Sequence, residues 1–222
     1  MINIAIDGPS GAGKSTVAKA LAKELSFVYV DTGAMYRAIG LYARDHGIAK
    51  DDADTLISAL PDISVTIAYE DGTQHVFLNG ADVSREIREN EISLYASAVS
   101  KIPAVRAYLS ELQKRLAREQ NVIMDGRDIG TVILPDAQLK IFLFASPEAR
   151  AQRRVLELRE KGQDVSYEQI LQEMKDRDDA DRTRAIAPAV PAPDAVMMDN
   201  SDMTIEENTK AIRELMAERG LI

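Results

Sequence analysis

The residue pattern with the clearest chemical meaning lies near the start of the chain. It matches G-x-x-x-x-G-K-[ST] and comprises, with the residue after it, Gly8, Pro9, Ser10, Gly11, Ala12, Gly13, Lys14, Ser15 and Thr16. In such a loop the glycines let backbone N–H groups turn toward phosphates, and the following helix adds its positive N-terminal end. The lysine reaches the β- and γ-phosphates and the serine hydroxyl binds Mg²⁺. The pattern therefore predicts a P-loop that binds ATP, with Lys14 as a catalytic cation and Ser15 as a metal ligand.

Phosphate binding alone does not separate a switch GTPase, a regulatory ATPase and a small-molecule kinase. A GTPase should carry Asp-x-x-Gly and Asn-Lys-x-Asp, and neither pattern occurs in this sequence. A regulatory ATPase needs no second anion site, whereas Arg37, Arg106 and Arg127 each follow a predicted strand. These arginines favour a kinase with a second, phosphorylated substrate, although a regulatory ATPase stays open as an alternative. A single arginine in an acidic protein is usually a solvated or ion-paired surface residue, so the inference depends on the motifs around them.

A phosphate acceptor would also explain why the sequence offers no clear catalytic base. The second pKa of a phosphate monoester is about 6, so at pH 7 the acceptor is already an anion and no side chain has to remove a proton. The two histidines fit this interpretation. His46 precedes Gly47 in a predicted loop, and His75 lies in a predicted surface strand.

The elements that must position these residues alternate between buried strands and amphipathic helices. The predicted strands are residues 2–6, 27–30, 122–124, 139–144 and 195–198. Helical spacing of apolar residues follows the first strand, recurs over residues 105–116, where Pro103 marks a start or a kink, and ends the chain over residues 204–218. Such alternation predicts a three-layer α/β fold with a five-stranded parallel sheet, whose ligands gather at the carboxyl ends of the strands. Asp7, Asp31 and Asp125 lie at three of these ends.

One segment interrupts this alternation. Ile63, Val65, Ile67 and Tyr69 alternate with polar residues, and Asp71-Gly72 has the composition of a hairpin turn. A second turn signal at residues 79–80 precedes Val83. We therefore expect a small antiparallel, three-stranded insertion over residues 61–87.

Composition limits the partners and the location. Lys and Arg number 27 against 36 Asp and Glu, so the net charge of −9 argues against a nucleic-acid or membrane surface. No cysteine is present, which excludes disulfides and cysteine-bound metals. The first predicted strand leaves no room for a signal peptide, and no apolar run approaches the ~20 residues of a membrane helix. We expect a cytoplasmic protein, and a monomer, because nothing in the sequence favours a dimer.

Four segments of the chain resemble one known family. Residues 7–15 (DGPSGAGKS), 31–37 (DTGAMYR), 125–131 (DGRDIGT) and 177–184 (RDDADRTR) are similar to motifs of the cytidylate kinases, in the order and spacing of that family. The insertion also resembles the enlarged CMP-binding region of the long bacterial type. The resemblance covers the chain from residue 2 to about residue 199, and it implies ATP-dependent phosphorylation of CMP, and of dCMP, with Mg²⁺.

The resemblance also implies roles for individual residues. Arg37, Arg106 and Arg127 would hold the CMP phosphate, with Thr32 beside the same nucleotide. Ser97 and Asp128 would contact the cytosine edge, and Asp181 and Arg184 would contact the sugar or phosphate. Arg177 would be a catalytic cation from a lid, with Arg127 as a further catalytic cation. Asp125 would orient Mg²⁺ through water.

Simpler interpretations of three of these features remain open. Asp125 could cap a turn, and Tyr36 could be a packing residue rather than a partner of the base. The charged run from Lys175 to Arg184 could be a solvated helix with alternating ion pairs. Its mixture of charges also suits a lid that closes over phosphates.

The domain organisation expected from these segments is a single P-loop kinase domain over residues 1–222. Its core comprises residues 1–60, 88–150 and 185–222. Residues 61–87 form the CMP-binding insertion and residues 151–184 the lid region.

Another small-molecule kinase, acting on UMP, dTMP or a non-nucleotide acceptor, is the nearest alternative.

Overall fold

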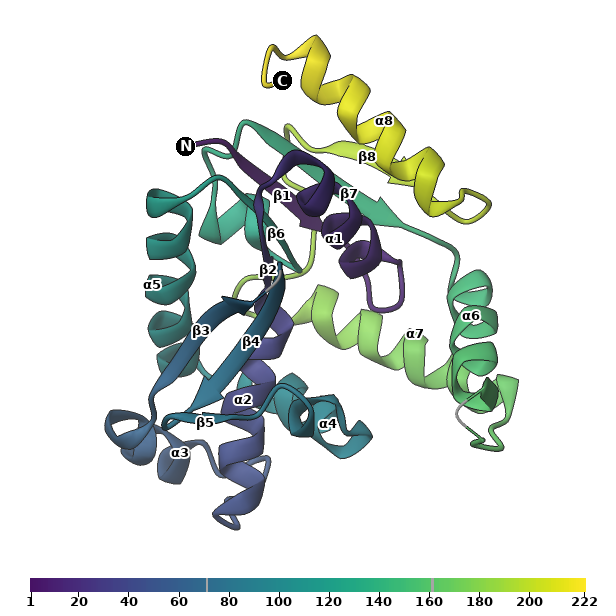
Figure 1. Ribbon diagram of the computed structural model, residues 1–222. Helices are drawn as coiled ribbons and strands as arrows, with labels where there is room; N and C mark the ends of the chain where they lie inside the picture. Colours follow the sequence, from purple (N-terminus) through teal and green to yellow (C-terminus); the bar gives the residue numbers. More distant parts are fainter. Residues whose placement is uncertain (71, 161) are drawn as a thin grey trace.

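The computed structural model describes residues 1–70, 72–160 and 162–222. At its centre lies a five-stranded parallel sheet with the strand order β2-β6-β1-β7-β8 (Figure 1). The strands are β1 (Asn3–Asp7), β2 (Val28–Asp31), β6 (Val122–Gly126), β7 (Leu139–Phe144) and β8 (Val196–Asp199). The predicted sheet is confirmed, with β1, β2 and β8 each displaced by one residue from the predicted ranges and β6 two residues longer than predicted.

Helices cover both faces of this sheet because its strands are apolar on both sides. In β1, Ile4 and Ile6 belong to a hydrophobic cluster with α1 (Lys14–Leu25) and α8 (Ile205–Glu218). Ala5, between them, belongs to a second cluster with α2 (Thr32–Asp45) and α5 (Pro103–Glu119). Successive side chains of a strand point to opposite faces, so this division confirms the three-layer architecture.

Local sequence explains where several helices begin. Pro103 is at the start of α5, which resolves the choice between a start and a kink, because proline has no N–H to lose there. Thr204 and Glu207 form a capping box at the start of α8. The remaining α-helices are α3 (Ala53–Ala59), α4 (Asn90–Val99), α6 (Pro147–Glu160) and α7 (Tyr167–Thr183). Short 3₁₀ helices lie at Leu60–Asp62 and Glu86–Arg88, and a single π-helical turn lies at Ile129–Ile133.

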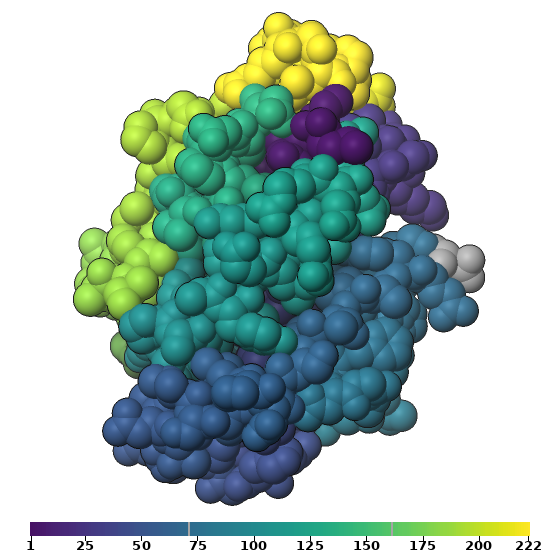
Figure 2. Space-filling view, turned by 90° about the vertical axis from the view of Figure 1, so that its left-hand side faces the viewer, coloured from purple at the N-terminus to yellow at the C-terminus, as the bar shows by residue number. Residues whose placement is uncertain are grey.

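The predicted insertion is a three-stranded antiparallel sheet of β3 (Val65–Glu70), β4 (Thr73–Leu78) and β5 (Ala81–Asp82). Asp71, in the predicted hairpin turn, lies outside the described residues. Val65 and Val76 are buried in the same hydrophobic cluster as α2 and β6. The insertion is therefore packed into the main core, at the end of the molecule that is blue in Figure 2.

The predicted lid region contains most of α6 and all of α7. Helix α7 crosses the molecule between the sheet and the α2–α4 region, and the loop that precedes α1 extends toward it (Figure 1). Among the described residues, no helix is both long and apolar enough to span a membrane.

Candidate active site

The loop between β1 and α1 has the geometry that phosphate binding requires. Gly8 has φ +145°, and a Cβ atom there would lie 1.9 Å from the carbonyl oxygen of Leu143, so only glycine fits. Helix α1 begins after Gly13, its first turn contains no acidic residue, and no side chain among the described residues caps it. Its positive N-terminal end therefore stays open for an anion.

The Lys14 ammonium group is buried at the start of α1. Its Nζ donates a hydrogen bond to the carbonyl oxygen of Pro9 at 2.7 Å. Burial, and then the neighbouring charge of Arg127, lowers the pKa of Lys14 to about 7, although Asp125 and Asp7 oppose the change. A polyphosphate bound at this position would supply negative charge that favours the protonated form of Lys14.

Behind the loop, Ser15 and Asp125 form a polar contact suited to Mg²⁺. The Ser15 hydroxyl donates to Asp125 Oδ2 at 2.7 Å, and the Tyr29 hydroxyl donates to Asp125 Oδ1 at 3.0 Å. Burial, and then Asp31, raises the pKa of Asp125 to about 6. In the described part of the chain no cluster of three metal-binding side chains occurs. This donor set fits Mg²⁺, which keeps several waters and takes other oxygens from substrate phosphates.

A single pocket brings together the predicted residues from distant parts of the chain. It is lined by Lys14, Ser15, Thr32, Arg37, Ser97, Arg106, Asp125, Arg127, Asp128, Arg177, Asp181 and Arg184, together with Ser10 and Gly11. Gly8, Pro9, Ala12, Gly13 and Thr16 complete the P-loop but do not line this pocket. The other lining residues come from helices α2, α4, α5 and α7, from the end of β6 and the segment after it, and from Arg184, which directly follows α7.

Three arginines of the pocket carry positive charge that the protein does not fully neutralise. Burial, and then Arg127, lowers the pKa of Arg177 to about 10, and the Arg177 Nε is buried without a hydrogen-bond partner among the described residues. Burial also lowers the pKa of Arg37, which lies near Asp31, Arg88 and Arg127. Arg127 Nε donates to Asp181 at 2.9 Å. This cation cluster is suited to a phosphate.

At another part of the pocket, Asp128 lies between two arginines. Its carboxylate accepts from Arg106 Nη2 and, at 3.2 Å, from Arg184 Nη2, and Asp128 is only 5% exposed. Burial raises the pKa of Asp128, while Arg106 and Arg184 oppose this rise. The Arg106 guanidinium lies 5.7 Å from the centre of the Tyr36 ring. Arg106 therefore makes its charged contact with Asp128, the residue predicted to contact cytosine.

The other predicted substrate residues have mixed surroundings. The Thr32 hydroxyl donates to the carbonyl oxygen of Asp125 at 2.8 Å and so joins α2 to β6. Ser97 lines the pocket from α4, and its carbonyl oxygen accepts from the Ser100 hydroxyl. Asp181 lines it from α7 and pairs with Arg127. Their substrate roles remain predictions.

Four polar residues that support the pocket were assigned no role from the sequence. Asp7 accepts from the backbone N–H groups of Ile129 and Gly130 at 2.8 and 2.7 Å. Arg88 pairs with Asp31 at 2.9 Å. The other two hold the P-loop: Arg150 donates to the carbonyl oxygen of Ser10 and Asn200 to that of Ala12. Of these four residues, only Asp7 could have been singled out from the sequence, because it lies at the end of the first predicted strand.

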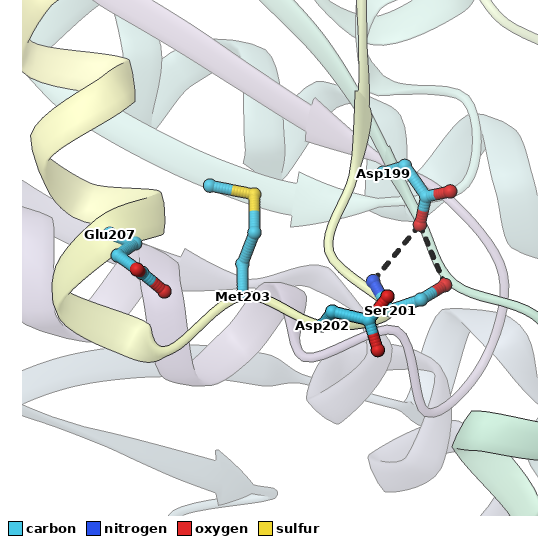
Figure 3. Close-up of a pocket in the computed structure, with 5 residues that line it drawn as sticks. All are labelled: Asp199, Ser201, Asp202, Met203 and Glu207. Carbon is cyan, nitrogen blue, oxygen red and sulfur yellow. Dashed lines mark hydrogen bonds between the residues drawn. The ribbon is translucent and has the colours of Figure 1, made fainter.

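A separate depression lies between β8 and α8 (Figure 3). It is lined by Asp199, Ser201, Asp202, Met203 and Glu207. Asp199 accepts hydrogen bonds from the backbone N–H and the hydroxyl of Ser201, at 2.9 and 2.7 Å. Its acidic lining does not suit a phosphate, which belongs in the arginine-rich pocket.

Comparison with known proteins places the whole chain in one family. A family model described as cytidylate kinase matches residues 4–218. The chain belongs to the cytidylate kinase family. A cytidylate kinase of Caldicellulosiruptor saccharolyticus is 51% identical over 214 residues, which cover 96% of this chain and 95% of that protein. One from Carboxydothermus hydrogenoformans is 45% identical and covers 99% of each chain.

Comparison with solved structures supports the fold. A shikimate kinase from Bacteroides thetaiotaomicron matches with a TM-score of 0.51 at 13% identity, covering 97% of this chain and 98% of that one. At this identity the likeness concerns the fold alone. The predicted P-loop kinase fold and the predicted kinase class are both confirmed.

Proposed function

We propose that this protein transfers the γ-phosphoryl group of ATP to CMP, and also to dCMP. The observation that carries the proposal is the pocket itself, in which a P-loop lysine, an arginine cluster and a buried carboxylate between two arginines line one space. The first two features suit the two phosphate groups that react. The carboxylate suits the amino group of a base.

On the ATP side, the P-loop N–H groups and Lys14 would bind the β- and γ-phosphates. Ser15 would hold Mg²⁺, and Asp125 would fix the Ser15 hydroxyl and bind a water of the ion. An ion held there would supply positive charge against the negative charge that develops during transfer. Lys14 would exchange its hydrogen bond to Pro9 for one to the nucleotide.

On the acceptor side, Arg37 and Arg127 would bind the CMP phosphate, with Thr32 next to it. Asp128 and Ser97 would contact cytosine. An ionised carboxylate has about four lone-pair positions, and the two arginines occupy two of them, so Asp128 can still accept from an exocyclic amino group. Asp181 and Arg184 would contact the sugar or phosphate.

Arg106 differs from the other arginines expected to bind the phosphate. Its guanidinium is hydrogen-bonded to Asp128 and to the carbonyl oxygen of Ser100. We therefore assign it to the base end of the acceptor, where it orients the Asp128 carboxylate.

The residues of the pocket would act by positioning the two nucleotides and by stabilising the negative charge of the transition state. Charge in the transition state lies on the equatorial oxygens of the migrating group, so cations held around it lower the barrier. Arg177, from α7, has a buried Nε with no hydrogen-bond partner in the part of the chain that the structure describes, and it would stabilise this charge. The acceptor phosphate needs no general base, in agreement with the exposed position of His46 and the hydrogen bond between His75 and Asp82.

A coupled assay of ADP release tests the proposal. ATP and Mg²⁺ are held fixed while CMP, dCMP, UMP, AMP, GMP and dTMP are offered in turn. We expect the highest kcat/KM with CMP and dCMP. A higher value with another monophosphate would overturn the acceptor assignment, and ADP release that no monophosphate stimulates would favour an ATPase instead.

A further inference from the structure

Arg150 of α6 is a buried arginine that no step above uses. It is 2% exposed, and its guanidinium donates in three directions. Nε donates to the carbonyl oxygen of Ala145 at 3.0 Å, Nη1 to that of Ser10 at 2.8 Å, and Nη2 to Asp178 Oδ2 at 2.5 Å. One side chain thus connects the end of β7, the P-loop and helix α7.

The contact with Ser10 depends on the shape of the P-loop. When the N–H groups of such a loop turn toward phosphates, its carbonyl groups turn outward and need other donors. Arg150 supplies the donor for Ser10. Helix α7 also packs on the loop, since a Cβ atom on Gly11 would lie 3.3 Å from Met174 Cε and 3.6 Å from Arg150 Cβ.

The contact with Asp178 lies next to the cation that we place at the migrating phosphoryl group. Asp178 directly follows Arg177 in α7. Arg127, the strongest charged influence, and Arg37 repel the Arg177 guanidinium, whereas Asp181 and Asp178 of the same helix attract it. The hydrophobic contacts between α6 and α7 involve Ile170 and Met174, nearer the start of α7. Beyond them, the Arg150–Asp178 pair offsets this repulsion.

We propose that the Arg150–Asp178 ion pair is a latch that holds α7 against the P-loop and thereby positions Arg177 for phosphoryl transfer. Arg150 is a positioning residue, because it reaches the reacting atoms only through Ser10 and Asp178. The inference rests on the proposed function, in which Arg177 acts on the migrating group. It links a correctly shaped P-loop to a correctly placed lid cation.

The first test compares variants of α7 in steady-state kinetics. A charge-assisted hydrogen bond corresponds to a factor of about 10 to 150, so Asp178→Ala should lower kcat at least about tenfold while KM for ATP and CMP changes less than about threefold. Asp178→Asn keeps an acceptor for Arg150 and should recover part of the loss. Asp179→Ala is the matched control, because Asp179 is exposed and pairs with Arg182 on the surface. Equal kcat values in Asp178→Ala and Asp179→Ala would overturn the latch.

Non-additivity separates a latch from independent structural damage. Arg150→Met should lower kcat, and the double variant Arg150→Met/Asp178→Ala should be no slower than the slower single variant, because Arg150→Met already removes the ion pair that Asp178→Ala breaks. If the fold-losses in kcat of the two single variants multiply in the double variant, the two residues act independently and the latch is refuted. Melting temperatures show that each variant is folded, and Arg154→Met, on the same helix but with an exposed partner in Glu157, is the control for Arg150.

A distance measurement tests the latch without turnover. The chain has no cysteine, so Lys23→Cys and Glu173→Cys place two spin labels on the exposed sides of α1 and α7. With Mg²⁺ and a non-hydrolysable ATP analogue, the parent should give one narrow distance distribution, and Asp178→Ala a longer or broader one, unlike Asp179→Ala. Identical distributions in all three would overturn the latch. If the parent protein does not phosphorylate CMP but the distance distribution of Asp178→Ala is still longer or broader, the proposed acceptor is refuted and the latch is supported.

Discussion

Asp128→Asn should change which base the enzyme accepts. The Asp128 carboxylate is fixed by Arg106 and Arg184, and we place its remaining acceptor positions opposite the amino group of cytosine. Uracil presents a carbonyl oxygen there, so two acceptors would oppose each other in a buried site. Asparagine keeps the shape and can turn an N–H donor toward that oxygen.

The magnitude follows from the contact that is lost. A charge-assisted hydrogen bond is worth ~1.5–3 kcal/mol, which lowers kcat/KM for CMP about 10- to 150-fold. UMP loses no such bond and is relieved of the repulsion. The ratio of kcat/KM for CMP to that for UMP should therefore fall at least about tenfold.

The assay is kcat/KM for CMP and UMP at saturating ATP, because this ratio reports differential stabilisation of the two transition states. KM for ATP should stay within about twofold of the parent. The exchange also leaves two buried arginines without their counter-charge, so the melting temperature is measured in parallel. Asp179→Asn, which alters an exposed carboxylate of α7, is the control. An unchanged ratio in folded Asp128→Asn would refute base recognition by this residue.

Three further predictions concern the lid, the P-loop and the insertion. Arg177→Ala should lower the single-turnover rate by about 10³-fold or more while both nucleotides bind nearly as before, and a parent-like rate would exclude it from the chemical step. Because the pKa of free Lys14 is lowered to about 7 and bound phosphates raise it, ATP binding at pH 8 should take up nearly one proton and weaken as pH rises above 7. Calorimetry in two buffers of different ionisation enthalpy measures this proton uptake. The control variant Lys19→Met should retain it. No uptake in the parent would mean that Lys14 is already protonated before ATP binds. Val76→Ala in β4 should cost about 2–3 kcal/mol in the free energy of unfolding, since Val76 is 1% exposed in the main cluster, and an unchanged denaturant midpoint would show that the insertion is loosely attached.

Much of the fold follows from local sequence. The P-loop pattern lies between a strand and a helix, apolar runs mark the buried strands, and Asn79-Gly80 supplies a turn in which both residues have positive φ. Each of these signals depends on residues within one element or turn. They are therefore readable before any long-range contact is known.

The parts of the site that sequence analysis missed depend on contacts between distant segments. Arg150 lies in a helix so rich in charge that it resembles a solvated surface helix, yet its guanidinium is buried against Ser10, 140 residues away. Asn200 reaches Ala12 across 188 residues. Arg106 was expected to bind a phosphate, and helical spacing could not reveal its pairing with Asp128. Periodicity shows which face of a helix is buried, but it does not name the partner of a polar side chain.

The most direct test of the central claim is a transfer experiment with ATP labelled in its γ-phosphate. The protein is mixed with labelled ATP, Mg²⁺ and CMP in a single turnover, and the products are separated. Label should move from ATP to the β-phosphate of CDP, with little inorganic phosphate, and Lys14→Ala should abolish the transfer. Label that appears in inorganic phosphate at the same rate with and without CMP would contradict the account.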